Sequence, residues 1–157
     1  NINNTNNNNN NDPTNSKYYL IVVQYTQAIN TKKLSSELRG LRPPGPTRLE
    51  SNYFSELRLA PERVSERLTG YGHNGVSPFG LLAMEDGGST SMIAVVVCKS
   101  IVTTEDGGND GSEDGGVVAP RFVWMGGGDR DWKLGMATSE FVRGVDGIVL
   151  DVSEPRA

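Results

Sequence analysis

The chain has few of the residues that most catalytic and metal sites require. Among its 157 residues are one cysteine, Cys98, and one histidine, His73. A single cysteine excludes an internal disulfide and a paired-cysteine metal or redox site. Cys98 lies in an apolar run, so we expect a buried core residue. Serine triads, cysteine triads and multi-histidine zinc sites would all have to share His73, which disfavours each of them. His73 itself is typical of a surface loop, with a role as a base as the alternative.

Long hydrophobic runs are also absent from the sequence. No apolar run approaches the roughly 20 residues that span a bilayer, and the first residues do not have the pattern of a signal peptide. We therefore expect a soluble, cytoplasmic protein with no membrane partner. The length of 157 residues is that of one ordinary domain.

The charge is unevenly distributed. The net charge is -4, but residues 17–70 carry nine Lys or Arg against five Asp or Glu, and residues 71–157 carry six against thirteen. A nucleic acid could therefore meet the basic first part of the chain. The alternative is that these charges only solvate the surface.

Hydrophobic patterning predicts an α+β fold with a mixed, mostly antiparallel sheet packed with short helices. Strands are expected over 18–25, 56–59, 92–98, 121–125, 132–136 and 148–152, the first of them central and buried on both faces. Helices are expected over 32–38 with Asn30 as N-cap, over 61–69, and over 138–143 with Thr138 or Ser139 as N-cap. The Asn-rich, low-complexity segment 1–16 should be disordered or a long loop.

One segment carries a resemblance to a known family. Residues 59–82 read LAPERVSERLTGYGHNGVSPFGLL, with a helix ending in TGY followed by a loop ending in SPFG. This resembles the signature of the YbaK and prolyl-tRNA synthetase associated editing domains. The strands and helices on either side follow the family's order, so the similarity covers residues 17–153, with apparent insertions at 40–46 and 106–116. The resemblance implies an editing-domain-like fold for residues 17–157.

The activity that the resemblance implies is hydrolysis of the ester of mischarged tRNA. The expected substrates are alanine, cysteine or a similar small amino acid on tRNA-Pro. The partner is the aminoacylated 3′ end of tRNA and, for an appended domain, an aminoacyl-tRNA synthetase; no cofactor or metal is expected. In the family a GxxxP loop presents backbone N–H groups to the substrate, and such donors stabilise charge on an ester carbonyl oxygen.

Carried over to this chain, the substrate-binding loop is Asn74, Gly75, Val76, Ser77 and Pro78. The family's leading glycine is replaced by Asn74, a residue type that tolerates positive φ. Because asparagine is bulkier than glycine, we expect it to narrow the pocket and to affect the choice of substrate.

A second departure concerns a lysine. In the family a lysine on the strand before the equivalent of 18–25 helps to hold the terminal nucleotide, and no residue of this chain is aligned with it. Lys17 leads the next strand, so the role is not transferred to it. We therefore expect the domain to lack the family's N-terminal helix and first strands. Three explanations stay open: the lysine lies on sequence outside this chain, the protein is naturally truncated, or it is a homologue that binds tRNA without cutting it.

Three glycines and a lysine near the C-terminal half complete the candidate site. Gly126, Gly127 and Gly128 follow a predicted strand, but no GxGxxG or GK[ST] pattern completes a nucleotide-binding fingerprint. They are expected either to line the substrate pocket or to form a plain tight turn, and Lys133 is the best candidate nearby to meet a phosphate. Trp124 and Trp132 are interpreted as core residues, with base-stacking platforms as the alternative.

Overall fold

The computed structural model describes residues 12–42, 44–46, 48–85, 87–88, 90–102 and 121–156. Its centre is a three-stranded parallel sheet in the order β1 (Tyr18–Val22), β3 (Ile93–Cys98) and β6 (Ile148–Leu150). The middle strand, β3, has a neighbour on each side, and its Val96, Val97 and Cys98 are fully buried. Cys98 is therefore a core residue, as predicted.

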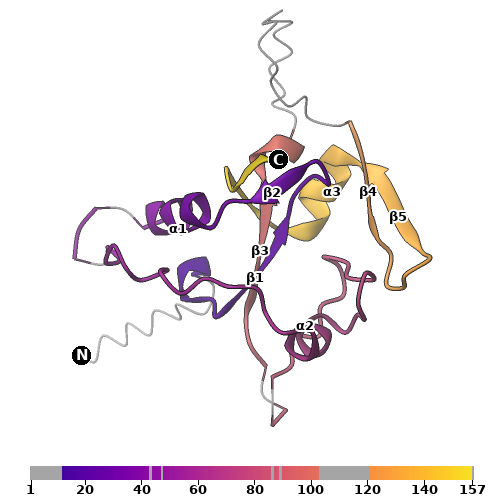
Figure 1. The fold of residues 1–157 in the computed structure, drawn as a ribbon, viewed down its shortest axis with the longest axis horizontal. Helices are drawn as coiled ribbons and strands as arrows, with labels where there is room; N and C mark the ends of the chain where they lie inside the picture. Colours follow the sequence, from indigo (N-terminus) through magenta and orange to yellow (C-terminus); the bar gives the residue numbers. More distant parts are fainter. Residues whose placement is uncertain are drawn as a thin grey trace, which may run out of the picture.

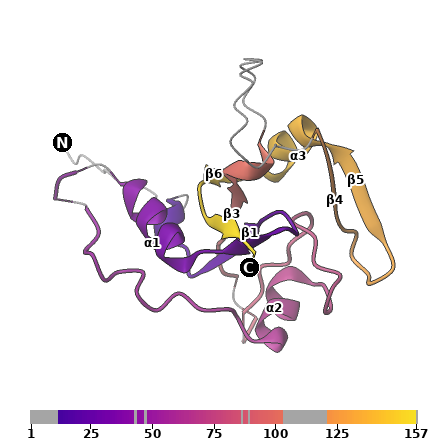
Figure 2. The same cartoon turned by 45° about the horizontal axis from the view of Figure 1, so that its top comes forward.

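Two small antiparallel ribbons accompany this sheet. One pairs β2 (Gln27–Ile29) with β7 (Ser153–Pro155), and the other pairs β4 (Phe122–Gly126) with β5 (Lys133–Ala137). In both views the β4–β5 ribbon stands at the opposite end of the molecule from α1 (Figures 1 and 2). The mixed α+β class is confirmed, whereas the expectation of a mostly antiparallel sheet is wrong, because the largest described sheet is wholly parallel.

The helices begin and end at local sequence signals. α1 (Thr31–Gly40) is capped by Asn30, whose side chain accepts hydrogen bonds from the N–H groups of the second and third helical residues. α2 (Glu62–Thr69) ends at Gly70, which has the left-handed φ of 79° typical of a C-cap. α3 (Thr138–Val145) follows β5 directly. Two short 3₁₀ turns are η1 (Pro13–Asn15) and η2 (Lys99–Ile101).

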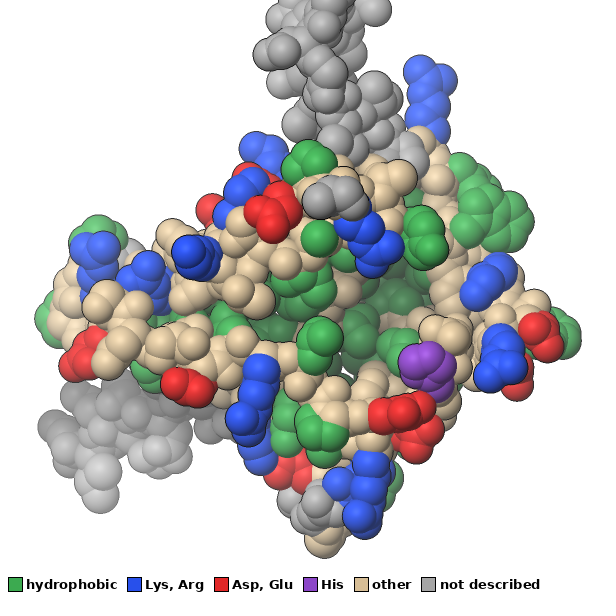
Figure 3. Space-filling model, viewed as in Figure 1, with side chains coloured by type: hydrophobic (Ala, Val, Ile, Leu, Met, Phe, Trp, Pro, Cys, Tyr) green, Lys and Arg blue, Asp and Glu red, His purple; other side chains and the backbone are tan. Residues whose placement is uncertain are grey.

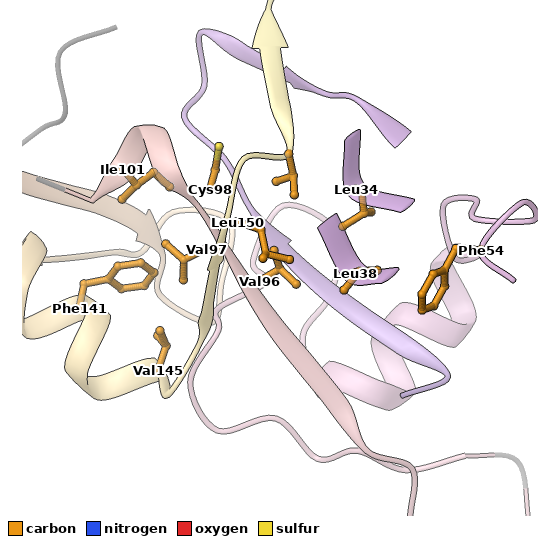
Figure 4. Close-up of a cluster of buried hydrophobic side chains, with 11 residues drawn as sticks. Leu34, Leu38, Phe54, Val96, Val97, Cys98, Ile101, Phe141, Val145 and Leu150 are labelled. Atoms are coloured by element: carbon orange, nitrogen blue, oxygen red, sulfur yellow. The ribbon is translucent and has the colours of Figure 1, made fainter. Parts of the chain in front are cut away.

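Helices cover both faces of the central sheet. Val96 and Val97 are successive residues of β3 and therefore point to opposite faces. Figure 4 shows Leu34 and Leu38 of α1 on the side of Val96, and Phe141 of α3 on the side of Val97. The core thus has three layers, with α1 on one face of the central sheet and α3 on the other. None of the helices in the described ranges is long and apolar enough to cross a bilayer.

Residues 18–25 were predicted to form a central strand. For the part of the chain that the structure describes, this prediction is wrong. β1 pairs with β3 alone there, and all five of its residues are only half-buried. A continuous apolar run fits both a central strand and an edge strand that packs on both faces, because hydrophobicity reports burial of the faces and not pairing of the edges.

Three further predictions are corrected by the structure. Residues 56–59 form turn and extended chain and pair with no described strand. The N-cap of α3 is Ala137, and Thr138 already belongs to the helix, because β5 runs into α3 without a loop. In segment 1–16, residues 1–11 lie outside the described part, whereas the 3₁₀ turn η1 buries Thr14.

Candidate functional site

The predicted substrate loop follows α2. Gly70 turns the chain out of the helix, and the Tyr71 hydroxyl donates a hydrogen bond to the Phe79 carbonyl, which closes the segment between them. Within it, the Gly75 N–H donates to the Gly72 carbonyl at 3.0 Å. Asn74 has a φ of 63°, so it adopts the left-handed backbone conformation that glycine adopts readily.

The glycine turn after β4 lies directly against this loop. The Gly128 N–H donates to the Gly75 carbonyl at 3.0 Å. A Cβ atom placed on Gly126 would lie 2.3 Å from the carbonyl oxygen of Val76, far inside van der Waals contact. In Figure 1 the segment after α2 accordingly lies beside the end of the β4–β5 ribbon. Two segments about 50 residues apart in the sequence therefore form one feature, and only glycine at position 126 allows their approach.

The loop offers backbone donors next to a cavity. Within the described ranges, the N–H groups of Val76 and Ser77 make no hydrogen bond. Val76 and Asn74 border a cavity of about 300 Å³ that is also lined by Glu62 and Glu66 of α2, whereas Ser77 is buried and does not line it. The Val76 N–H points away from the β4–β5 ribbon, because in a trans peptide it is antiparallel to the Gly75 carbonyl, which accepts from Gly128.

Lys133 and His73 occupy the rim of this region. Lys133 is the cross-strand partner of Gly126 in the ribbon, and its side chain is exposed. His73 is exposed, as expected of a loop histidine, and its Nδ1 lies 3.5 Å from an Oε1 atom of Glu62. The structure therefore brings together the predicted loop, the glycine turn and the predicted phosphate-binding lysine.

The interpretation of the tryptophans as core residues is wrong. Trp124 and Trp132 are both 72% exposed. In β4 the alternation places Val123 and Met125 against the core, which leaves Phe122 and Trp124 on the other face. Both faces of this strand are apolar in sequence, so the pattern could not show which one is buried. Figure 3 shows hydrophobic side chains gathered on the surface over this ribbon.

A second, larger cavity lies beside the outer edge of β1. It measures about 500 Å³ and is lined by the β1–β2 region and residues 57–60. Sequence reasoning found no ligand residue here. Burial raises the pKa of the Tyr19 hydroxyl, which lines this cavity, to about 12, so the group stays neutral.

The described residues give no support for a metal centre or a reactive thiol. No group of three or more His, Cys, Asp or Glu side chains among them is arranged to hold a metal ion. Burial raises the pKa of the Cys98 thiol, but hydrogen bonds with Ser100 and Ser153 outweigh burial and leave this pKa lowered. Because the side chain is fully buried, we interpret these contacts as core packing.

Comparison with known proteins supports the fold alone. No protein-family model matches the sequence, and no curated protein matches it. The structure is similar to the crystal structure of hypothetical protein APE2540, with a TM-score of 0.54 and 24% sequence identity. The match covers 87% of this chain and 65% of that one, so this chain spans less than two thirds of that protein's length.

Proposed function

We propose that the protein is an aminoacyl-tRNA deacylase of the YbaK and prolyl-tRNA synthetase associated type. Its substrate would be tRNA-Pro mischarged with alanine, cysteine or a similar small amino acid. The observation that carries the proposal is the contact between the predicted loop and the glycine turn, sealed by the hydrogen bond from Gly128 to Gly75. This contact supports the loop from the side of the β4–β5 ribbon.

The proposed chemistry uses the main chain. Water attacks the ester carbonyl, and negative charge builds on the carbonyl oxygen. The N–H group of Val76, which has no partner within the described ranges and borders the cavity, donates to that oxygen. The acyl bond to the ribose oxygen then breaks, and that oxygen leaves as a hydroxyl with the proton that the attacking water gives up. A hydroxyl of the tRNA's terminal ribose helps to activate the water. The turn supports this role because its donors are fixed before the substrate arrives, so stabilising the charge needs little reorganisation.

A non-catalytic tRNA-binding or synthetase-binding module is the second candidate. One observation favours it: no lysine or arginine lines the 300 Å³ cavity at the loop among the described residues. The family's lysine role thus has no counterpart in this cavity.

The proposal is tested by deacylation of mischarged tRNA. We expect the chain to accelerate ester loss from tRNA-Pro carrying alanine, cysteine or serine. Gly75→Ala should lower the rate by up to about 100-fold, the cost of a misplacement of about 1 Å. Its Cβ would lie 3.1 Å from the Gly128 backbone and displace the loop by a few tenths of an ångström or more. Pro78→Ala should also lower the rate, because proline fixes the loop's shape.

Gly40→Ala is the matched control. This glycine lies at the end of α1, and a Cβ atom there would meet nothing within 4 Å. The deacylation rate of Gly40→Ala should equal that of the wild type. Unchanged deacylation by both loop variants would remove the loop from the mechanism. Tight binding of mischarged tRNA without any ester loss would favour the binding module.

A further inference from the structure

His73 and Glu62 form a pair at the wall of the cavity beside the substrate loop. The imidazole Nδ1 of His73 lies 3.5 Å from a carboxylate oxygen of Glu62, and both residues line the cavity. A carboxylate beside Nδ1 favours the tautomer in which Nδ1 carries the proton. The other ring nitrogen, Nε2, then has a free lone pair and can accept a proton. The pair therefore has the arrangement of a base and the group that orients it.

A tight turn brings His73 close to the Val76 donor. The Gly75 N–H donates to the Gly72 carbonyl at 3.0 Å, so residues 72–75 form a β-turn with His73 and Asn74 at its centre. The φ of 63° at Asn74 is typical of the third residue of a type II turn. Val76 follows the turn directly and borders the same cavity as His73. A ligand in this cavity can therefore meet the imidazole and the Val76 N–H together.

The other titratable groups at this cavity are less suited to take a proton from water. Among the described residues that line it, these groups are Glu66 of α2 and Tyr71, and no lysine or arginine lines it. The Tyr71 hydroxyl already donates its proton to the Phe79 carbonyl. Glu66 is exposed, and a solvated carboxylate is a much weaker base than imidazole. The side chain of His73 is 68% exposed, so water reaches its ring.

We infer that His73 is the general base of the proposed ester hydrolysis and that Glu62 is its positioning residue. The inference rests on the proposed function, because His73 acts on the same acyl ester that the Val76 N–H meets. Nε2 accepts a proton from water while the water oxygen bonds to the acyl carbon. The bond from that carbon to the ribose oxygen then breaks, and Nε2 returns the proton to the ribose oxygen. The products are the free amino acid and a ribose hydroxyl.

The test is deacylation of tRNA-Pro mischarged with alanine, with kcat and KM measured separately. His73→Ala should lower kcat by about 100-fold, a typical contribution of a general base, and leave KM little changed. Free imidazole in the buffer should restore part of the lost rate, because the exposed position leaves room for it beside the loop. A merely structural role of the side chain would not respond to imidazole.

The dependence of the rate on pH gives a second readout. The ratio of the wild-type rate to the His73→Ala rate should rise from about pH 5 to about pH 8, the range in which histidine loses its proton. This ratio cancels the titration of the substrate's own amino group. Glu62→Gln should lower kcat less than His73→Ala does, because the imidazole remains. Glu140→Gln is the matched control, since Glu140 is an exposed residue in the first turn of α3, and its kcat should equal that of the wild type.

Three outcomes would overturn the base. Equal rates for His73→Ala and wild type would remove His73 from the mechanism, while ester hydrolysis, and with it the proposed function, stands. A loss of rate that imidazole does not restore and that stays constant with pH would make the contribution of His73 structural. Failure of the wild type to accelerate ester loss at all would refute the base and the proposed function together.

Discussion

Gly126 decides how closely the substrate loop and the β4 strand approach. The space that a side chain would need is filled by main-chain atoms of Val76, which cannot rotate away as a flexible side chain can. Asn74 plays the complementary part, because it holds a left-handed conformation that most residues resist. The geometry of the turn thus depends on the absence of a side chain at Gly126 and on the left-handed backbone of Asn74.

Gly126→Ala is expected to destabilise the protein by about 1–3 kcal/mol, as overpacking against a fixed backbone does. Thermal unfolding followed by circular dichroism would measure the loss as a lower Tm. Gly72→Ala serves for comparison, because a Cβ atom there would meet nothing within 4 Å. Equal Tm values for the two variants would show that the loop does not pack on Gly126 as described.

At the scale of elements, η1 fixes the chain before β1 through a small polar cluster. Asp12 accepts hydrogen bonds from the Thr14 N–H at 2.9 Å and from the Thr14 hydroxyl at 2.6 Å, and its carboxylate lies 3.1 Å from Arg42. The hydrogen bonds from Thr14 and the charge of Arg42 lower the pKa of Asp12 in the folded state. The ionised carboxylate therefore stabilises the fold.

This contribution should depend on pH in a defined direction. A lowered folded pKa adds stability above the unfolded value of 3.8, and the stability is lost as the pH falls through the folded pKa. Asp12→Asn should therefore lower the free energy of unfolding by about 1 kcal/mol near neutral pH, and the difference should shrink as the pH falls below 3.8. Urea unfolding at several pH values measures this. A difference between Asp12→Asn and wild type that stays constant with pH would contradict the assignment.

Elements with local signals could be predicted from the sequence, and those without could not. α1 and α2 follow from Asn30, Pro61 and Gly70, because caps act within a few residues. β2 and β7 were missed because three-residue strands carry no period and exist only through pairing with each other. The parallel arrangement of β1 and β3 depends on contacts about 75 residues apart, which hydrophobic patterning does not encode.

At the scale of the whole molecule, the candidate site is assembled from two segments: the loop between α2 and β3, and the glycine turn of the β4–β5 ribbon. The loop and the glycine turn could each be predicted from the sequence, but their contact through Gly75 and Gly128 depends on how the β4–β5 ribbon docks. The exposure of Trp124 could not be predicted either, since both faces of β4 are apolar. Tertiary packing therefore decided which predicted residues share a site.

The central claim is that the main-chain donor at Val76 meets the acyl group at the end of an RNA. Nuclear magnetic resonance tests it most directly, through ¹H–¹⁵N shifts of the labelled chain titrated with a non-hydrolysable 3′-aminoacylamino-adenosine. We predict the largest amide shift at Val76, at the cavity beside the loop. Shifts confined to the cavity beside β1, at residues 18–22 and 57–60, would contradict it.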